Sequence, residues 1–517
     1  MKPVKNHRFC AFLALTLTLL IISSDVFAKA DTSVPYDSYN YDYRENIVFT
    51  PSPYVPDGSI SGLKLGIGAF NSPQDVCVAD DGRVYVADTM NNRIVVIDPT
   101  LSRCIEIIDS FETDDGSAGT FNKPYGIAIS NTNELYVADS QNKRIVILSA
   151  PAAPADSTDV TKNERTYIGS ISNPKSEVLA DDFDFVPLKV TVDYAGRVYV
   201  VADNMFEGIM VFENGAFTGF FGTINVTITV WEKIWRKLST KTQRSKQQLF
   251  IPTEFTGIDV DDAGFIYASN IDENGIQAIR RLNPKGQDVI RKGENLNVGG
   301  DLRYNNSWDA GDYNGPSEIV DVVVRDNGIY SLLDKKRGRV FTYDSEGNLL
   351  YIFGGLGSQI GTFSVPSAIE CIGDKLMVLD SYRGELILFS ETEYGNLINE
   401  AVGLRYDGDE TQAVPLWERV LELDENNELA NVGIGKAYLT SGDNKAAMKY
   451  LKLGMSRRYY SIAFKRYRDE ILKKWLAPVL SGLIILIFVL TVFKAIRKKR
   501  RNKKLYAKGE GGAQEDE

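Results

Sequence analysis

"VYVADTMNNRIVVID" (Val84–Asp98) and "LYVADSQNKRIVILS" (Leu135–Ser149) are two copies of one pattern, 51 residues apart. In each copy, Val, Ile and Tyr dominate two short runs on either side of a polar turn. Such runs are typical of β-strands joined by tight turns. The pattern therefore predicts a repeated sheet unit.

Four more degenerate copies follow the same frame, beginning at Pro187, Phe255, Pro316 and Pro366. Each copy carries an acidic or amide residue after its second strand, at Asp88, Asp139, Asp203, Asn270, Asp334 and Asp380. One small sheet cannot bury both of its faces, whereas six sheets arranged radially in a closed ring can. We therefore predict an all-β six-bladed propeller over residues 65–392.

The segment (V/L)-Y-V-A-D-(T/S)-x-N-(N/K)-R-I in the first two copies resembles the signature of NHL-repeat propellers. In this pattern an Asp and an Arg flank a turn, where Asp commonly accepts hydrogen bonds from backbone N–H groups. We interpret these residues as structural rather than catalytic. They are Asp88 with Arg93, Asp139 with Arg144, and Asp334 with Arg339, whereas the sixth copy has Glu385 at the Arg position.

Closure of the ring needs a strand from outside the six copies, because the sixth copy contains only three strands. Residues 29–64 precede the first copy, and we expect part of Arg44–Tyr54 to supply the outer strand of the sixth blade.

Both ends of the chain carry membrane-topology signals. Residues 1–28 have a basic start, an apolar run and small residues near Ala28, which is typical of a secretory signal peptide; an uncleaved anchor is the alternative. Residues 475–493 include 18 consecutive uncharged residues, and the tail 494–517 begins with a basic cluster. This predicts one transmembrane helix, a cytoplasmic tail and an extracytoplasmic N-terminal domain in a cell membrane.

Residues 393–474 have a different period, because Gly408-Asp409 recurs as Gly442-Asp443 after 34 residues. This region resembles tetratricopeptide repeats, which are helix–turn–helix units. A plain helical spacer and a protein-docking module both remain open.

Residues 223–250 interrupt the propeller with a basic segment in which Trp231 and Trp235 have helical spacing. This segment is either a surface helix packed by its tryptophans or a contact for a partner protein or anionic lipid.

The composition limits the partners and reactions that can be expected of this chain. The net charge is −11, and because both ends are basic, residues 29–475 carry −18, which argues against a nucleic-acid partner. The only histidine is His7 in the signal peptide, so Ser–His and Cys–His pairs and His-ligated zinc are absent from the mature chain. We find no metal-ligand spacing and expect no cofactor and no enzymatic activity. The alternative is a propeller lactonase or hydrolase that uses an oxygen-ligated metal.

A ligand site is expected where the inner strands begin, at one mouth of the central channel. The residues expected there are Gln74, Tyr125, Lys189, Glu254, Glu318 and Ser367, with Asn91, Asp272 and Tyr382 on turns and Trp308 on a loop. Their mixture of aromatic, amide and charged groups suits a glycan.

The layout resembles that of bacterial membrane proteins that accompany carbohydrate-type ABC uptake systems. The resemblance implies a membrane-anchored binding or scaffold protein, accessory to a solute uptake or envelope complex. Protein partners would dock on a propeller face or on the repeat helices.

Overall fold

The computed structural model describes residues 34–510, apart from 158, 173, 180–182, 206, 223–253, 273–276, 294–298 and 304–314. The predicted signal peptide 1–28, the insertion 223–250, Trp308 and the end of the predicted tail lie outside the described residues. The chain divides into two compact units, one that ends at Tyr406 and one that begins at Asp407.

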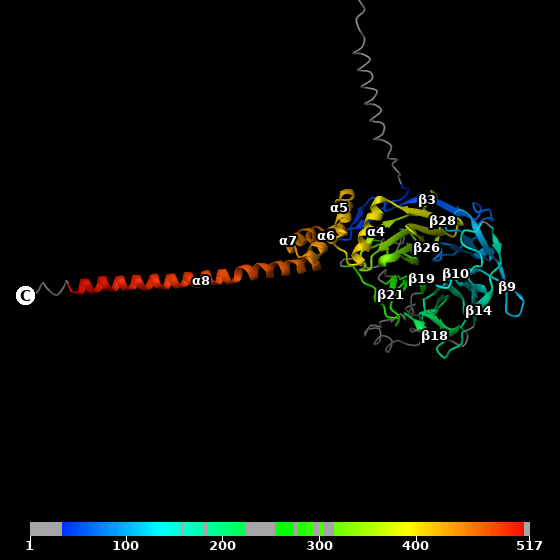
Figure 1. Ribbon diagram of the computed structural model, residues 1–517, viewed down its shortest axis with the longest axis horizontal. Helices are drawn as coiled ribbons and strands as arrows, with labels where there is room; N and C mark the ends of the chain where they lie inside the picture. Colours follow the sequence, from blue (N-terminus) through cyan, green and yellow to red (C-terminus); the bar gives the residue numbers. More distant parts are fainter. Residues whose placement is uncertain are drawn as a thin grey trace, which may run out of the picture. The chain divides into compact units, whose positions relative to one another are not determined.

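The first unit is a six-bladed β-propeller (Figure 1). Blade one contains β4 (Asp75–Val78), β5 (Val84–Asp88), β6 (Arg93–Ile97) and β7 (Cys104–Ile108). Blade two contains β10 (Pro124–Ile129), β11 (Leu135–Asp139), β12 (Arg144–Leu148) and β14 (Tyr167–Ser172). Blade three contains β15 (Pro187–Val192), β16 (Val198–Ala202), β17 (Ile209–Glu213) and β18 (Ala216–Phe221).

The second half of the ring is less uniform. Blade four has three described strands, β19 (Phe255–Val260), β20 (Ile266–Asn270) and β21 (Ile279–Leu282). Blade five contains β22 (Ile319–Val324), β23 (Tyr330–Asp334), β24 (Arg339–Tyr343) and β25 (Leu349–Phe353). Blade six contains β26 (Pro366–Ile372), β27 (Lys375–Asp380) and β28 (Glu385–Glu391). Inner strands such as β26, β19 and β10 surround the centre of the unit in Figure 1.

Short elements decorate the blades. A hairpin of β8 (Ser110–Glu112) and β9 (Ala118–Thr120) follows blade one, and β13 (Thr161–Lys162) pairs in parallel with β7. The hydrophobic cores lie between neighbouring blades: Val86 of blade one packs with Met377 of blade six, and Val137 of blade two with Tyr85 of blade one. Strands buried on both faces explain the nearly continuous apolar runs in the sequence.

Ring closure comes from β3 (Tyr54–Ser61), which pairs antiparallel with β28, so that Ile60 lies opposite Leu386. Blade six therefore takes its outer strand from the N-terminal segment, but from a later part than Arg44–Tyr54. The earlier strands β1 (Tyr39–Tyr41) and β2 (Ile47–Phe49) instead extend blade five, through the pairing of β1 with β25. The predicted closing segment was thus placed too early.

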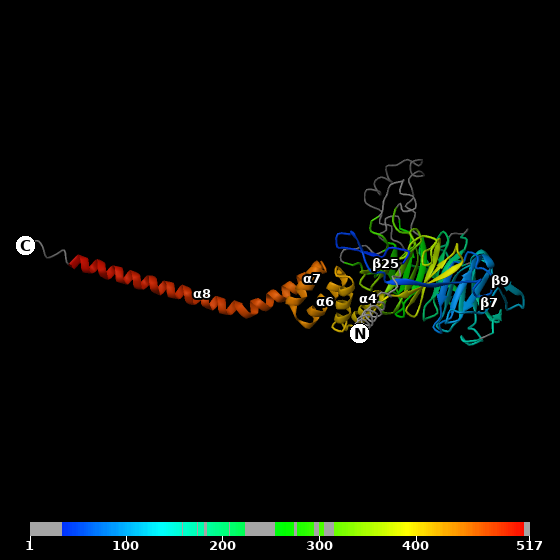
Figure 2. The same ribbon diagram turned by 90° about the horizontal axis from the view of Figure 1, so that it is seen from above.

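Helix α4 (Glu393–Tyr406) belongs to the propeller unit, because its Gly403 packs against Asn327 and its Arg405 pairs with Asp344 at 2.7 Å. The second unit contains α5 (Val414–Leu423), α6 (Glu428–Ser441), α7 (Asn444–Leu453) and α8 (Arg457–Glu510). Figure 1 labels α5, and Figure 2 shows α6, α7 and α8 from above. The boundary between the units thus falls after α4, whereas the predicted domain boundary falls before it. The tetratricopeptide-like nature of these helices stays a prediction.

Candidate functional site at the propeller axis

One position of the inner strand recurs in every blade. In blades one and five it lies opposite the residue that precedes the repeat Asp, since Asp75 lies opposite Ala87 and Asp321 opposite Leu333. In blade three the pairing is shifted by one residue, so that Lys189 lies opposite Val201. The six residues at this position, all buried, are Asp75, Gly126, Lys189, Gly257, Asp321 and Ala368. We call this set the axial ring.

Lys189 closes the axial ring. Its Nζ lies 2.5 Å from Oδ1 of Asp75 and 3.3 Å from Oδ1 of Asp321, so that blades one, three and five meet at the axis. The second oxygen of each carboxylate accepts a backbone hydrogen bond, from Ile127 N at 2.9 Å and from Ile369 N at 3.0 Å. Each hydrogen bond comes from the next blade, so the ion pairs also join neighbouring blades.

The other three blades contribute small residues to the axial ring. A Cβ atom at Gly126 would lie 2.4 Å from the carbonyl oxygen of Leu188, and one at Gly257 would lie 2.6 Å from Oδ1 of Asp321. Such distances are far below van der Waals contact, so glycine is required for this close approach. The axial ring therefore has charged residues in blades one, three and five and Gly or Ala in blades two, four and six. This alternation allows the residues of the ring to pack closely against one another.

One residue before each axial-ring position, at the start of the inner strands, the side chains are less buried. We call this set the mouth ring; its six residues, all half-buried, are Gln74, Tyr125, Leu188, Thr256, Val320 and Ser367. Two of its hydroxyls bridge blades, because Thr256 Oγ1 donates to the carbonyl of Ile319 at 2.7 Å and Ser367 Oγ to that of Pro73 at 3.3 Å. The mouth thus offers an aromatic ring, an amide and hydroxyls above a closed floor.

Below the axial ring lie two further carboxyl groups, Asp259 and Glu370, which are half-buried. Burial, together with the nearby charge of Asp321, raises the pKa of Asp259 to about 7. Burial and the charge of Asp259 raise the pKa of Glu370 well above its usual range. Burial also raises the pKa of Asp321, to about 6, against the lowering effect of Lys189. Among the described residues, the axis therefore holds more carboxyl groups than the Lys189 ammonium neutralises.

The axis does not fit the oxygen-ligated metal of the alternative function. The Lys189 ammonium already lies between Asp75 and Asp321, where a cation would need those carboxylates as ligands. Among the described residues, no group of three or more His, Cys, Asp and Glu side chains is placed to hold a metal ion.

The structure brings together only part of the predicted ligand site. Gln74, Tyr125 and Ser367 lie in the mouth ring, whereas Lys189 lies one level deeper in the axial ring. Glu254 and Glu318 immediately precede the residues that pair with Asn270 and Asp334, so both precede their inner strands.

The predicted turn residues have separate environments. Asn91 Nδ2 is held by Asp88 Oδ2 at 2.8 Å, and Asp272 accepts the backbone N–H of Gln277 at 2.8 Å. Tyr382 is 80% exposed, and Trp308 is outside the described residues.

Sequence reasoning missed Asp75 and Asp321, although each is a lone charged residue in an apolar strand, in "PQDVCV" and "IVDVVV". Such a residue is rarely buried unless it is paired, which is the signal that was available.

The repeat Asp residues anchor turns. Asp88 accepts Arg93 Nε at 2.7 Å and the backbone N–H of Asn71 at 2.7 Å. Asp139 accepts Arg144 Nε at 2.8 Å. Blade three departs from the pattern, because Ala202, rather than Asp203, pairs with Pro187.

In blades five and six, the guanidinium group beside the repeat Asp belongs to the residue three positions after that Asp, rather than five. Arg337 lies 3.6 Å from Asp334, and Arg383 lies 3.7 Å from Asp380. Arg339, at the repeat Arg position, therefore forms no ion pair with Asp334. Its Nη1 contacts Asp301 Oδ2 at 2.6 Å instead.

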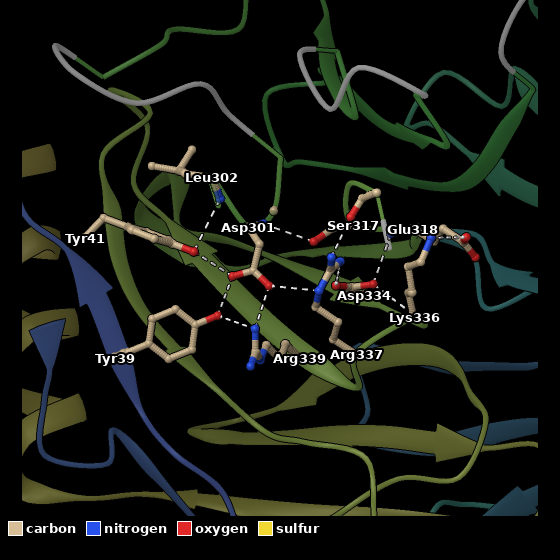
Figure 3. A network of polar contacts seen from close by, with 12 residues as sticks. Tyr39, Tyr41, Asp301, Leu302, Ser317, Glu318, Asp334, Lys336, Arg337 and Arg339 are labelled. Atoms are coloured by element: carbon tan, nitrogen blue, oxygen red, sulfur yellow. Dashed lines mark hydrogen bonds and ion pairs between the residues drawn. The ribbon is translucent and has the colours of Figure 1, made fainter. Parts of the chain in front are cut away.

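Asp301 is the centre of the network in Figure 3, which joins the N-terminal strand β1 to blade five. It accepts hydrogen bonds from the hydroxyls of Tyr39 and Tyr41 and pairs with Arg339 and, at 3.3 Å, with Arg337. These groups satisfy one another inside the unit. We therefore interpret the network as a structural link between β1 and blade five rather than as a ligand site.

Comparison with known proteins supports this description of the fold. The NHL repeat family model matches residues 70–97 and 121–148, which confirms that the first two copies are NHL repeats. NHL repeat-containing protein 2 of Gallus gallus is 33% identical over 111 residues, which cover 18% of this chain and 15% of that protein. Protein SUPPRESSOR OF QUENCHING 1, chloroplastic, of Arabidopsis thaliana is 30% identical over 101 residues, which cover 18% of this chain and 10% of that protein. The chain thus spans a small part of both relatives.

Two solved structures are similar at low identity. Virginiamycin B lyase from Staphylococcus aureus is 10% identical, with 68% of this chain and 87% of that chain covered and a TM-score of 0.36. A gluconolactonase from Xanthomonas campestris is also 10% identical, with 66% and 98% covered and a TM-score of 0.36. Similarity this remote carries no argument about activity. The fold and the family match define a six-bladed propeller that begins with NHL repeats.

Proposed function

We propose that this chain is a membrane-anchored binding protein that recognises a ligand at the mouth of its propeller axis. The observation that carries the proposal is the buried contact of Lys189 with Asp75 and Asp321, directly below the half-buried mouth ring. A closed floor under an accessible rim makes a shallow recognition surface. Because the floor's charged groups are already engaged with one another, they are poorly placed to act on a substrate.

A glycan or another polyhydroxylated solute is the ligand class that suits the mouth ring best. The ring of Tyr125 supplies an apolar face for stacking, and Gln74 and Ser367 supply fixed polar groups. Tyr125 lies close enough to Lys189 for the ammonium charge to act on the pKa of its hydroxyl, which burial raises. The mouth therefore combines apolar and polar contacts above a charged floor.

Helix α8 supports membrane anchoring. It carries an 18-residue window with a mean hydropathy of 2.7, none of which is buried, so it is long and apolar enough to cross a membrane. We place the propeller on the extracytoplasmic side because the N-terminus reads as a secretory signal. The resemblance of the layout to bacterial membrane proteins that accompany carbohydrate-type uptake systems implies an accessory role in an uptake or envelope complex, and we propose protein partners on a propeller face or on helices α5–α7.

Two parallel assays test the proposal. Full-length protein in detergent micelles is screened on a glycan array, and the same sample is assayed for lactone hydrolysis with and without chelator. We expect glycan binding without turnover. Chelator-sensitive hydrolysis with no glycan bound would instead support the hydrolase alternative.

A further inference from the structure

The part of α8 that precedes its apolar window is strongly basic. Seven Lys or Arg side chains lie between Arg457 and Lys474, against the two acidic residues Asp469 and Glu470. A basic cluster was expected only after the span, where residues 494–504 carry eight. The N-terminal side of the span therefore has a charge pattern of its own.

One side of this segment is already used inside the second unit. Tyr459, Tyr460 and Ala463 pack against α7 residues such as Leu451. At about 100° per residue, Lys465 lies on the opposite side of the helix from Ala463.

Arg468 also lies on the side opposite Ala463, whereas Lys473 and Lys474 follow just before the apolar window; all three are exposed, as is Lys465. Within the described part of the chain, Lys465 and Lys473 take part in no ion pair, and Arg468 pairs with its neighbour Asp469. Arg466 differs, because it donates to the carbonyl of Leu439 at 3.1 Å.

We infer that Lys465, Arg468, Lys473 and Lys474 form a collar that binds the headgroups of anionic phospholipids in the leaflet on the N-terminal side of the span. The inference rests on the membrane anchoring proposed above. Lipid is favoured over an acidic protein by distance. With a rise of about 1.5 Å per residue, Lys473 lies about 3 Å and Lys465 about 15 Å before Trp475.

The headgroup layer is about 5–8 Å thick, and charges interact over a further ~8–10 Å at physiological salt. All four cations of the collar are within that range along one continuous helix. Arg457 and Arg458, on the same helix, lie about 26 Å before Trp475 and are beyond it. The distance limit thus supplies a matched control pair.

The test uses full-length protein reconstituted in vesicles, with spin-labelled phosphatidylglycerol and phosphatidylcholine as probes. The readout is the association constant of the anionic lipid relative to the zwitterionic lipid. We expect the double variant Lys473→Gln, Lys474→Gln to lower this ratio severalfold, since each cation near the surface contributes about fivefold at most. The control Arg457→Gln, Arg458→Gln should keep the native ratio, and 1 M salt should reduce the native ratio.

The outcomes separate the two proposals. Protein that does not float with vesicles contradicts the anchoring and the collar together. Protein that floats while the Lys473, Lys474 variant keeps the native lipid ratio overturns the collar alone and points to an acidic protein partner. Equal losses in both double variants would also overturn it, because the effect would then not depend on distance from the span.

Discussion

Nζ of Lys189 in blade three lies 2.5 Å from Oδ1 of Asp75 in blade one, although the two residues are 114 positions apart in the chain. Both side chains are buried, and Asp321 of blade five completes the group. Because a buried ion pair loses hydration on both sides, its main effect appears when one partner is removed. The stability of the fold should therefore be sensitive to the removal of one charged side chain at the axis.

The first prediction concerns this ion pair. Lys189→Met should lower the free energy of unfolding by about 3–5 kcal/mol, because Asp75 and Asp321 would be left as buried carboxylates without a cation. Denaturant unfolding measures the change. The control is Lys143→Met, which removes an exposed ion pair with Asp184 and should change stability by less than about 1 kcal/mol. Equal effects of the two variants would show that the axial contact is not stabilising.

The second prediction is a pH dependence that arises from Glu370. Burial raises its pKa in the folded state above the value of about 4.3 in an unfolded chain. The folded protein therefore holds this proton more tightly, so the contribution of Glu370 to stability is greatest below about pH 4 and falls as the pH rises towards the raised pKa.

Glu370→Gln keeps the acceptor that Cys371 N contacts at 2.8 Å but removes the titration. Between pH 4.5 and pH 8 the variant should lose less stability than the native chain, by on the order of 1 kcal/mol or more. Asp80→Asn, at an exposed turn, is the control and should follow the native profile. Parallel native and Glu370→Gln profiles would contradict the prediction.

The third prediction tests ring closure. Ile60→Asp in β3 should destabilise the propeller by about 3 kcal/mol or more, because Ile60 is 5% exposed in the core between blades six and one. Phe49 in β2 is 69% exposed, so Phe49→Asp should change stability by about 0.5 kcal/mol or less. Thermal unfolding compares them. A larger effect at Phe49 would support closure by the earlier segment.

The blades could be predicted because their information is local. Val, Ile and Tyr runs with Asp and Gly turns define each blade within a short stretch of sequence. The closing strand was harder to find, since "YVPDGSIS" contains Pro56 and Gly58, which argue against a strand. Both residues are tolerated because β3 is the outermost strand of its sheet, where a missing N–H faces away from the ladder.

The register of blade five was misread because Pro316 looks like the prolines that start other inner strands. In the structure that strand starts at Ile319. The residue before it, Glu318, donates its backbone N–H to Asp334 at 3.0 Å. The axial ring itself could not be derived, because its charged members lie in different blades and meet only after the ring closes. A local pattern can indicate that Asp75 and Asp321 are paired, but it does not identify Lys189 as the partner.

The fourth prediction concerns topology. External protease on intact cells should remove the propeller and leave a small fragment that retains a C-terminal tag. The basic residues on either side of the span are nearly balanced, so the orientation depends mainly on the N-terminal signal. Lysed cells are the control, in which the tag should also be digested. Digestion of the tag from outside intact cells would show that the orientation is the opposite of the one proposed.

The central claim is that the propeller binds its ligand at the mouth ring, and the most direct test compares two tyrosines at opposite ends of the inner strands. Tyr125 lies at the start of β10, whereas Tyr194, 64% exposed, lies on the turn that follows β15. For the glycan bound most tightly on the array, Tyr125→Ala should weaken affinity about 5- to 30-fold, as expected for the loss of a stacked ring worth ~1–2 kcal/mol. Tyr194→Ala should leave affinity unchanged. Unchanged affinity in Tyr125→Ala, with folding intact, or a loss confined to Tyr194→Ala, would contradict the claim.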